Sequence, residues 1–536
     1  MSRIPRLARA AVPALAAALL PAGCGGSGGG GSQAAAVPIP VSVPQAYRPS
    51  GHAAAGDVFV QLFEWTWPDV ARECEQWLGP KGYRAVQVSP PNEHAVIGGY
   101  PWWQRYQPVS YRLDRSRSGT LAQFQDMVAR CAAVGVDIYA DAVVNHMAAD
   151  SGILGGVGSA GSPYQKYAYP AVPYGASDFH LPCAVSNYQD AANVQDCELS
   201  GLADLRTEAA SVRARVAAYL VAMNAMGVAG FRIDAAKHVP AADLDAILAQ
   251  VDAAAAAAGR AAPYVFLEII DNPAEAVTPR QYYGVGYVSG GAADITEFLY
   301  GYRVSDVFLG RNGATMAGLL PAALDAGLMP SDKAVVFTDN HDNQRSGNIR
   351  YADTAYELAV AFTLAQPQGY PVVMSSYGFD LATQAGRDSG PPSSGAGVTS
   401  STFDAAGNSA CTAQLGSQQV GRWICEHRRP AIAAMVGFRR YTASAPGGAW
   451  QSPAPSTLAF ARTGMGFFAV NTGTSDVTAS FQTTLPAGSY CDVFGGSFDA
   501  VARTCTTTPV AIAADGSATI RVPAGAAVAL HGGARL

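Results

Sequence analysis

Charged residues are scarce in this chain. They make up 14% of 536 residues, and the formal net charge is -6. This balance argues against a nucleic-acid-binding surface and against a polybasic membrane patch. Long apolar runs are also missing, because the run over residues 11–20 is too short to span a bilayer. The composition fits a globular protein with a weakly charged surface, for which a neutral polymer is a natural partner.

Closely spaced cysteine pairs are absent too. No CxxC pair occurs, which argues against a metal cluster held by thiolates, the alternative use of so many cysteines. The chain has nine cysteines, and eight remain when Cys24 is set aside. Eight suffice for four disulfides in an oxidising compartment, but their spacing does not reveal which residues pair.

The N-terminus has the features of an export signal. Arg3, Arg6 and Arg9 precede the apolar run, which ends in Pro-Ala-Gly at residues 21–23, directly before Cys24. Small residues before a cysteine resemble a bacterial lipoprotein cleavage site. We predict a signal peptide over residues 1–23, a tether rich in Gly, Ser and Pro over 24–55, and a secreted protein. Cys24 is then a possible lipid anchor, with ordinary signal cleavage nearby as the alternative.

From residue 57 onward, short apolar runs alternate with helical stretches such as 121–134 and 212–226. Several runs are almost continuously apolar, as expected for parallel strands buried on both faces. Eight such runs predict an α/β fold, a (β/α)8 TIM barrel. The eight predicted strands are residues 57–63, 85–89, 137–145, 230–234, 264–269, 293–298, 334–340 and 370–377.

Two regions do not follow the alternation. Residues 147–208, between the third and fourth predicted strands, are too long for a simple loop, and we predict a small inserted domain there. After about residue 447, short strands alternate with Gly and Pro turns, which predicts an antiparallel all-β sandwich over 447–536. The barrel is then formed by residues 56–146 and 209–446.

Polar residues gather where four of the predicted strands end. In such barrels, strand ends at the C-terminal face carry the catalytic groups. A single Asp after a strand is usually a helix N-cap, but four polar strand ends on one barrel are hard to explain that way. These segments are 141–146, 230–238, 266–268 and 337–342.

The residue types fit hydrolysis of a glycosidic bond with retention. That reaction needs a carboxylate nucleophile and a protonated carboxyl group about 5–5.5 Å apart. Asp234 lies two residues after Arg232, on the same side of the strand, so the guanidinium should keep it ionised. Glu268 follows an apolar run, where burial and neighbouring carboxylates should hold its proton. Asp342 is the third carboxylate, and His146 and His341 are neutral hydrogen-bond donors for sugar hydroxyls.

Three further sequence motifs are QVSPPNE at 87–93, PWWQRYQPVSY at 101–111 and MSSY at 374–377. Together with the four strand ends they resemble the α-amylase family, glycoside hydrolase family 13, and in detail its animal-type branch. The resemblance runs from about residue 57 to the C-terminus. It implies an enzyme that cleaves internal α-1,4 bonds of starch and related glucans.

By this resemblance Asp234 is the nucleophile, Glu268 the acid/base and Asp342 the transition-state stabiliser. Aromatic side chains can bury the apolar face of a sugar ring, and this role suits the two tryptophans of the second motif. The alternative for those tryptophans is a place in the core. The implied substrate-binding residues are Trp102, Trp103, Tyr106, Gln107, His146, Arg232, Lys237, His238 and His341.

The resemblance also implies a structural Ca²⁺ between the barrel and the inserted domain. Its ligands would be Asn145, Asp204 and the carbonyl oxygens of Gln195 and His238, hard oxygen donors of the kind calcium prefers. The implied disulfides are Cys74–Cys131, Cys183–Cys197, Cys411–Cys425 and Cys491–Cys505. A further family disulfide is missing, because Asp114 and Ala148 occupy its positions.

One departure concerns chloride. Animal-type α-amylases hold this ion with two basic residues and an Asn; Arg232 and Asn340 match two of them, but Val372 occupies the third position. An isopropyl group offers an anion no charge and no donor, so we predict an enzyme that does not require chloride.

The sequence leaves other functions open. They are another α-glucan hydrolase or transglycosylase on the same barrel, a non-catalytic glucan-binding lipoprotein, and a protein-binding scaffold. The complete set Asp234, Glu268 and Asp342 argues against the last two. We expect a monomer that does not bind nucleic acid and has no transmembrane segment.

Overall fold

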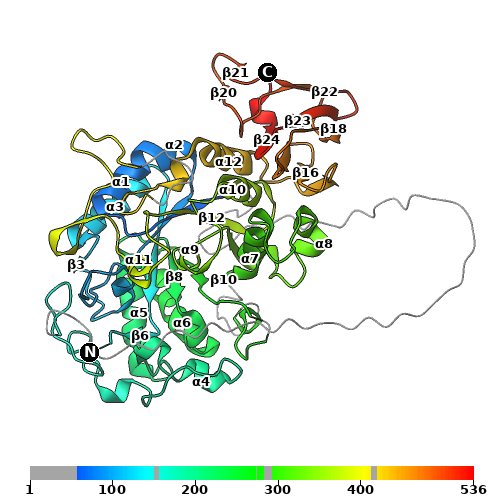
Figure 1. The fold of residues 1–536 in the computed structure, drawn as a ribbon. Coiled ribbons are helices and arrows are strands. Elements are labelled where there is room, and N and C mark those ends of the chain that lie inside the picture. The colour runs from blue at the N-terminus through cyan, green and yellow to red at the C-terminus, as the bar shows by residue number, and fades with distance from the viewer. Residues whose placement is uncertain (1–56, 150–155, 273, 283–292, 412–418) are drawn as a thin grey trace, which may run out of the picture. The chain divides into compact units, whose positions relative to one another are not determined.

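The computed structural model describes residues 57–149, 156–272, 274–282, 293–411 and 419–536 (Figure 1). The predicted signal peptide and tether, with Cys24, lie outside the described residues. Among the described residues, no helix is long and apolar enough to cross a membrane.

Eight parallel strands close into a barrel, as predicted. Around the barrel they run in the order β1-β12-β11-β10-β9-β8-β5-β2, so each strand lies beside its neighbour in sequence and the last pairs with the first. The strands are β1 (Phe59–Leu62), β2 (Ala85–Val88), β5 (Asp137–Val143), β8 (Gly230–Asp234), β9 (Tyr264–Leu267), β10 (Asp294–Thr296), β11 (Ala334–Phe337) and β12 (Tyr370–Ser375).

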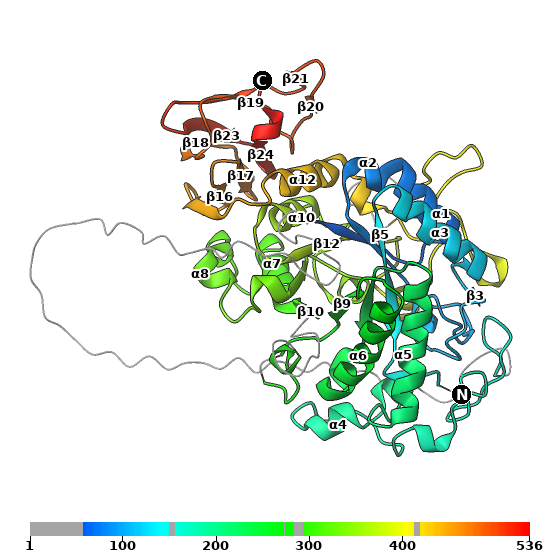
Figure 2. The same cartoon turned by 180° about the vertical axis from the view of Figure 1, so that it is seen from behind.

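Helices surround these strands, which Figure 2 shows from behind. Local sequence explains where several begin: Thr120 and Gln123 form a capping box at the start of α3, and Pro430 occupies the first turn of α12. The larger helices are α1 (Trp67–Glu73), α3 (Leu121–Ala133), α5 (Ala210–Ala225), α6 (Ala241–Ala257), α7 (Phe298–Phe308), α10 (Tyr356–Ala365) and α12 (Pro430–Tyr441). Shorter ones are α2 (Gly79–Lys81), α4 (Ala191–Gln195), α8 (Pro321–Leu324), α9 (Asn343–Ser346) and α11 (Gln384–Asp388).

The inside of the barrel is layered because alternate residues of each strand point inward. An aromatic layer fills one level: the rings of Tyr139 and Tyr264 lie 5.1 Å apart, and those of Phe59 and Tyr370 lie 4.8 Å apart. Gly230 leaves room for this layer, because a Cβ there would approach the Tyr139 ring to 2.7 Å. Several of the next inward positions along the strands are polar, among them Gln61, Asp141 and Arg232, and they form the floor of the site described below.

The segment between β5 and β8 returns to its starting point. The short strands β6 (His146–Met147) and β7 (Ala203–Asp204) pair antiparallel, so both ends of the long connection are held together at the end of β5. Short elements fill the described part of this connection, including α4 and a Cys183–Cys197 disulfide. This arrangement has the form of the inserted domain that the sequence predicted.

The C-terminal part is all-β, as predicted. A four-stranded sheet has the order β15-β16-β17-β24, and β18 pairs with β23. Phe467, Phe481, Ile520 and Leu530 belong to a separate apolar core between these strands. The strands are β15 (Gly447–Gln451), β16 (Thr457–Arg462), β17 (Gly466–Asn471), β18 (Val477–Gln482), β19 (Gly488–Tyr490), β20 (Phe498–Asp499), β21 (Thr504–Cys505), β22 (Val510–Ile512), β23 (Ser517–Val522) and β24 (Ala526–His531).

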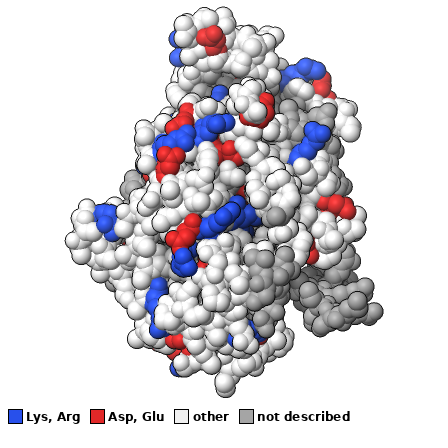
Figure 3. Space-filling model, turned by 90° about the vertical axis from the view of Figure 1, so that its left-hand side faces the viewer, with Lys and Arg blue, Asp and Glu red and all other residues white. Residues whose placement is uncertain are grey.

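Four disulfides are formed, and they confirm the implied pairing: Cys74–Cys131, Cys183–Cys197, Cys411–Cys425 and Cys491–Cys505. The surface seen in Figure 3 is mostly formed by uncharged residues, with Lys, Arg, Asp and Glu in scattered groups. This agrees with the low charge content of the sequence.

Candidate active site

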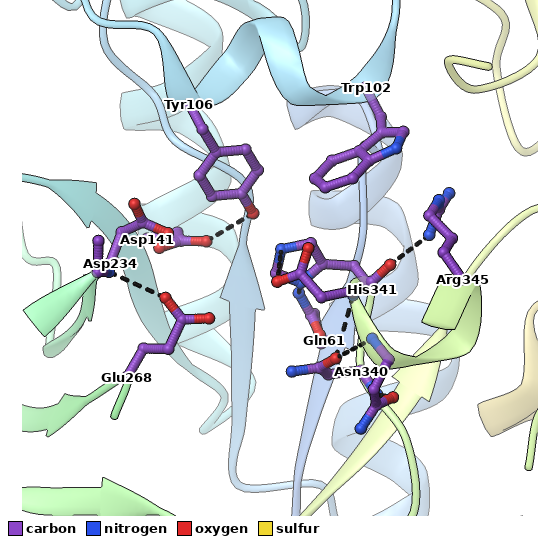
Figure 4. A network of polar contacts seen from close by, with 12 residues as sticks. Gln61, Trp102, Tyr106, Asp141, Asp234, Glu268, Asn340, His341 and Arg345 are labelled. Atoms are coloured by element: carbon purple, nitrogen blue, oxygen red, sulfur yellow. Dashed lines mark hydrogen bonds and ion pairs between the residues drawn. The ribbon is translucent and has the colours of Figure 1, made fainter. Parts of the chain in front are cut away.

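Three adjacent strands carry the central charged residues. The pairing of β5, β8 and β9 places Asp141 beside Arg232, and Arg232 beside Phe266. Asp234 is the last residue of β8, and Glu268 follows β9 directly, with its backbone N–H donating to the Ile233 carbonyl. In Figure 4, Asp141, Asp234 and Glu268 therefore lie together on one side of the site.

One guanidinium group connects the three carboxylates. Arg232 Nη1 lies 2.6 Å from Asp141 Oδ1 and 2.9 Å from Asp234 Oδ1, while Nη2 lies 2.5 Å from Glu268 Oε1. Arg232 and Asp234 thus share a side of β8, as the sequence predicted. The guanidinium is not reserved for Asp234, however, because Asp141 and Glu268 also contact it.

The backbone after β8 adds a contact to Glu268. Ala235 has a φ of 50°, in the left-handed region that residues with a Cβ rarely adopt. The chain turns sharply there, and the Ala235 N–H donates to Glu268 Oε2 at 2.9 Å. The sharp turn thus aims a backbone donor at the second oxygen of Glu268.

The electrostatics differ from the sequence-based expectation for Asp234. Burial raises the pKa of Asp234 well above its usual value, the Glu268 carboxylate raises it further, and Arg232 opposes both effects. Arg232 lowers the pKa of Asp234, as predicted, but burial and Glu268 outweigh this effect in the free site, so the prediction that the guanidinium keeps Asp234 ionised was wrong there. Burial and then Glu268 also raise the pKa of Asp342 to about 7, although its side chain is 44% exposed and solvent screens part of this effect. Burial and the neighbouring Glu268 carboxylate thus raise the pKa of both Asp234 and Asp342.

Aromatic rings and a neutral histidine form the opposite wall (Figure 4). The His341 ring stacks on Tyr106 with 5.2 Å between centroids, and Trp102 meets His341 edge-on at 5.5 Å. His341 Nδ1 lies 3.0 Å from Gln61 Nε2, and its Nε2 lies 3.2 Å from Asp342 Oδ2. Burial lowers the pKa of His341 well below its usual value, so the ring is neutral, as predicted.

His146 and Tyr106 link the two walls. His146 Nε2 lies 2.9 Å from the Tyr106 carbonyl oxygen, and burial lowers the pKa of His146 to about 4. The Tyr106 hydroxyl donates to Asp141 Oδ2 at 2.9 Å. Gln107 is 7% exposed and accepts from the Ala149 N–H at 3.1 Å.

Lys237 and His238 lie in another group, after β8. Lys237 Nζ contacts Glu275 and donates to the Ile270 carbonyl at 2.9 Å. Lys237 Nζ and the His238 ring both lie against Tyr188, 5.4 Å and 6.3 Å from its centroid. Trp103, like Trp102, is partly buried against the main core, so both tryptophans keep some exposed surface.

The sequence pattern indicates no role for Asp141 or Arg345. Asp141 is fully buried. Its place in the polar segment 141–146 was the only sequence feature that could have indicated a role in the site. Arg345 donates to the His341 carbonyl and, through Nε, to the Arg387 carbonyl at 3.0 Å. Its guanidinium lies 4.1 Å from the Phe379 ring centroid and 5.0 Å from that of Trp102. It therefore ties the loop that carries His341 to the aromatic wall.

The segments that carry two of the candidate calcium ligands are neighbours, because the N–H of Leu205, the residue after Asp204, donates to the Asn145 carbonyl at 3.0 Å. His238 Nδ1 lies 2.7 Å from the Val194 carbonyl, which joins α4 to the segment after β8. His180, which the sequence analysis did not identify, lies 2.7 Å from Asp204 Oδ2 and 3.9 Å from Asp196, the residue after Gln195. Among the described residues no hydrogen-bond donor contacts the buried Asp204 Oδ1. A buried carboxylate oxygen without a donor suits a cation.

A small cavity lies inside the barrel between Arg232 and the wall of His341. Its volume is about 20 Å³, which holds one water-sized particle. Its lining combines polar side chains with the apolar side chains of Phe266, Val335, Phe337 and Val372. Arg232, Asn340 and Val372, the three positions compared in the chloride prediction, all line this cavity.

Comparison with known proteins agrees with this geometry. The family described as "Alpha amylase, catalytic domain" matches residues 89–265, and "Alpha amylase, C-terminal all-beta domain" matches residues 450–533. The chain is 44% identical to an α-amylase of Thermomonospora curvata, over 98% of this chain and 79% of that one. It is 42% identical to an α-amylase of Tribolium castaneum, over 90% and 96%.

Solved structures give the same result. The crystal structure of α-amylase I from Eisenia fetida superposes with a TM-score of 0.80 at 35% identity, covering 91% of this chain and 99% of that one. A variant of the same earthworm enzyme, solved as a complex with maltohexaose, superposes with a TM-score of 0.79 at 35% identity, over 92% and 99%. The chain therefore belongs to the α-amylase family and is a glycoside hydrolase.

Proposed function

We propose that this enzyme hydrolyses internal α-1,4-glucosidic bonds of starch and related glucans with retention of configuration. The observation that carries the proposal is the contact of Asp234 and Glu268 with the two terminal nitrogens of Arg232, at the ends of adjacent barrel strands. Carboxylates held by one guanidinium suit the short separation that retention requires. The complex of the earthworm relative with maltohexaose supports an α-glucan as the substrate.

In the proposed reaction, Asp234 attacks the anomeric carbon while Glu268 donates its proton to the leaving oxygen. The glycosidic bond breaks, and a covalent glycosyl ester forms on Asp234. Glu268, now a carboxylate, takes a proton from water, which attacks the anomeric carbon and releases Asp234. Arg232 supports both anions in turn. Asp342, on the opposite wall, stabilises the positive charge that develops on the sugar ring.

The walls of the site provide the groups for sugar binding. Trp102, Trp103 and Tyr106 offer aromatic faces, and His146 and His341 offer neutral ring nitrogens. Lys237 and His238 lie near Tyr188, beyond the carboxylates, and we assign them to the part of the glucan on the leaving-group side. Gln107 contributes through the backbone that it holds at Ala149.

The same proposal includes a structural Ca²⁺ at Asn145, Asp204 and the carbonyl oxygens of Gln195 and His238. The orphaned Asp204 Oδ1 supports this assignment. When bound, the ion would neutralise the buried carboxylate and join the segment around α4 to the end of β5. His180 orients Asp204 through its other oxygen.

We also propose that the enzyme works without chloride. The cavity beside Arg232 has an apolar side chain, Val372, in place of a second cation, and Arg232 is already surrounded by three carboxylates. An anion there would face this negative charge and a desolvation cost. A water molecule fits the cavity volume better.

We further propose that the enzyme is secreted and monomeric. Cys24 is its proposed lipid anchor. The four disulfides support an oxidising compartment. Mass spectrometry of the protein isolated from its producing cells would identify a diacylglyceryl group on Cys24 or a different mature N-terminus.

Proton NMR of starch cleavage tests the reaction. We expect the new reducing ends to appear as the α anomer before mutarotation, and the polymer to shorten faster than small sugars accumulate. Products of the β configuration would refute retention. Transfer of glucan to acceptor sugars as the main reaction would instead indicate a transglycosylase.

A further inference from the structure

Gln61 is a buried polar residue of β1 that lies next to the loop carrying His341 and Asp342. Phe59, two residues earlier, belongs to the aromatic layer, so Gln61 occupies the next inward position of the strand. Its side chain is buried and lines the small cavity together with His341. Gln61 Nε2 lies 3.0 Å from Nδ1 of the His341 ring, and Figure 4 shows the two side chains beside each other. The first strand of the barrel thus contacts the loop after β11.

The His341 ring has little freedom to move. It stacks on Tyr106 and on Phe63, with 5.2 Å and 4.8 Å between centroids, and Trp102 meets it edge-on at 5.5 Å. Arg345 donates to the His341 carbonyl and so holds the backbone as well. What can still change is the position of the single ring hydrogen that a neutral imidazole carries, on Nδ1 or on Nε2.

Two contacts favour the same position of that hydrogen. The Gln61 Nε2 group only donates, so His341 Nδ1 accepts and the ring hydrogen is on Nε2. His341 Nε2 lies 3.2 Å from Asp342 Oδ2, where an N–H attracts the carboxylate and a lone pair would repel it. If the amide were turned around, the Gln61 oxygen would require the hydrogen on Nδ1, and the Nε2 lone pair would face Asp342. The observed arrangement avoids this repulsion.

We propose that Gln61 is a positioning residue for the reaction, because its amide fixes His341 in the tautomer that carries the hydrogen on Nε2. This role rests on the proposed hydrolysis of α-1,4-glucans, in which ionised Asp342 stabilises the positive charge on the sugar ring. The Nε2–H group of His341 beside Asp342 favours the ionised form of that carboxylate. The same group can donate a hydrogen bond to the sugar, which the other tautomer cannot do.

The ionisation of Asp342 reports on this donor. Burial raises the pKa of Asp342 to about 7, so the carboxylate titrates in a range where activity can be measured. A substitution at Gln61 leaves the other charged and titratable groups around Asp342 in place. These groups are Glu268, Arg232, Arg345, Asp141, Tyr106 and Tyr302.

The first test determines the tautomer directly in the full-length protein. Heteronuclear NMR of isotope-labelled histidine shows which ring nitrogen carries a hydrogen, and the chain has only eight histidines. The signals of His341 are those that are missing from the spectrum of His341→Gln. We expect the hydrogen on Nε2 and none on Nδ1. A wild-type His341 with its hydrogen on Nδ1 overturns the proposal.

The second test measures kcat and KM against pH in two variants without the amide. Gln61→Met keeps the length of the side chain, and Gln61→Leu is a shorter apolar replacement. Gln87→Met is the matched control, because Gln87 lies beside Gln61 on β2, is buried and lines the same cavity. Among the described residues no hydrogen bond joins Gln87 to His341, whereas one joins Gln61 to it. Melting temperatures show whether each variant is folded.

Without the Gln61 donor, the tautomer with the hydrogen on Nδ1 becomes populated and Asp342 loses a partner of its ionised form. We expect kcat/KM to fall about three- to tenfold, the effect of one hydrogen bond. The acidic limb of the kcat/KM profile should also shift to higher pH. A loss of packing alone would lower the rate at every pH and leave this limb in place.

The outcomes separate the two proposals. An acidic limb in the folded Gln61 variants that coincides with that of Gln87→Met overturns the role of Gln61. A wild type that has the hydrogen on His341 Nε2 but cleaves no α-glucan overturns the proposed function instead.

Discussion

Asp141→Asn tests how the buried carboxylates share Arg232. Asp141 is fully buried and accepts two hydrogen bonds, from Arg232 Nη1 at 2.6 Å and from the Tyr106 hydroxyl at 2.9 Å. Asparagine has the same shape but only one side-chain carbonyl, so it cannot accept both bonds equally well. One donor loses its partner and the guanidinium loses a counter-charge.

The magnitude follows from these two contacts. A hydrogen bond to a charged group contributes about 1.5–3 kcal/mol, and a buried donor left unpaired costs about 1–3 kcal/mol. Arg232 retains Asp234 and Glu268, which limits the loss to about 2–4 kcal/mol. If this whole loss of free energy applies to the transition state, kcat/KM falls about 30- to 1,000-fold.

The pH dependence gives a sharper readout. The negative charge of Asp141 raises the pKa of Asp234 and that of Asp342. Removing this charge lowers both pKa values, so the site loses its proton at a lower pH. Because Asp234 can act as the nucleophile only when it is ionised, the acidic limb of the kcat/KM profile should shift to lower pH in Asp141→Asn.

The same carboxylates affect stability. Both pKa values are raised above their ordinary value of 3.8, so their contribution to the free energy of unfolding is complete below about pH 4. It is lost as the pH rises, for Asp342 through about 7. The melting temperature of Asp141→Asn should depend less on pH over this range than that of the wild type.

The matched control is Asp137→Asn, at the opposite end of the same strand. Asp137 pairs with Arg84 at 3.4 Å, and its side chain is 23% exposed. Its pH profile should match that of the wild type. An acidic limb of Asp141→Asn that stays in place or moves to higher pH would refute the electrostatic account of the site.

Three further predictions concern calcium, chloride and the C-terminal domain. Chelation should lower the melting temperature, because an ion present at 1,000 times its dissociation constant stabilises the native state by about 4 kcal/mol; in Asp204→Asn chelation should have little effect, and an unchanged wild type would contradict the site. Chloride titration at constant ionic strength should leave the activity unchanged, and Val372→Arg should then make the enzyme respond to chloride. A saturable activation of the wild type would show that another residue replaces the cation missing at Val372. Arg462→Met should reduce the free energy of unfolding by about 3 kcal/mol, because the buried guanidinium donates to three carbonyl groups. Arg521→Met, at a side chain that is 65% exposed, should change it by less than about 0.5 kcal/mol, and equal effects would refute this reasoning.

The barrel and its catalytic strand ends could be predicted from the sequence because they are local patterns. Each strand is a short apolar run, and polar residues such as Asp234 and Glu268 stand out directly after it. The disulfides could be predicted only through the family resemblance, because spacing leaves their pairing open. The match of Val372 to a chloride-ligand position also came from the resemblance. Its place at the cavity depends on the strand order of the barrel, in which β12 lies between β1 and β11.

Contacts between distant segments could not be predicted in this way. Tyr106 reaches Asp141 across 35 residues, and Arg232 meets Asp141 across 91, through strand pairing that the sequence pattern does not specify. His180 reaches Asp204 within the inserted segment, which has no regular periodicity. The ionisation of Asp234 was predicted wrongly for the same reason, since only the folded arrangement shows that three carboxylates share Arg232.

The activity of Asp234→Asn on starch tests the central claim most directly. The amide keeps the shape of the side chain but cannot act as the nucleophile, so the initial rate should fall by several orders of magnitude. An unchanged melting temperature would show that the loss is chemical. A folded variant that hydrolyses starch within about tenfold of the wild-type rate would contradict the assignment of Asp234 as the nucleophile.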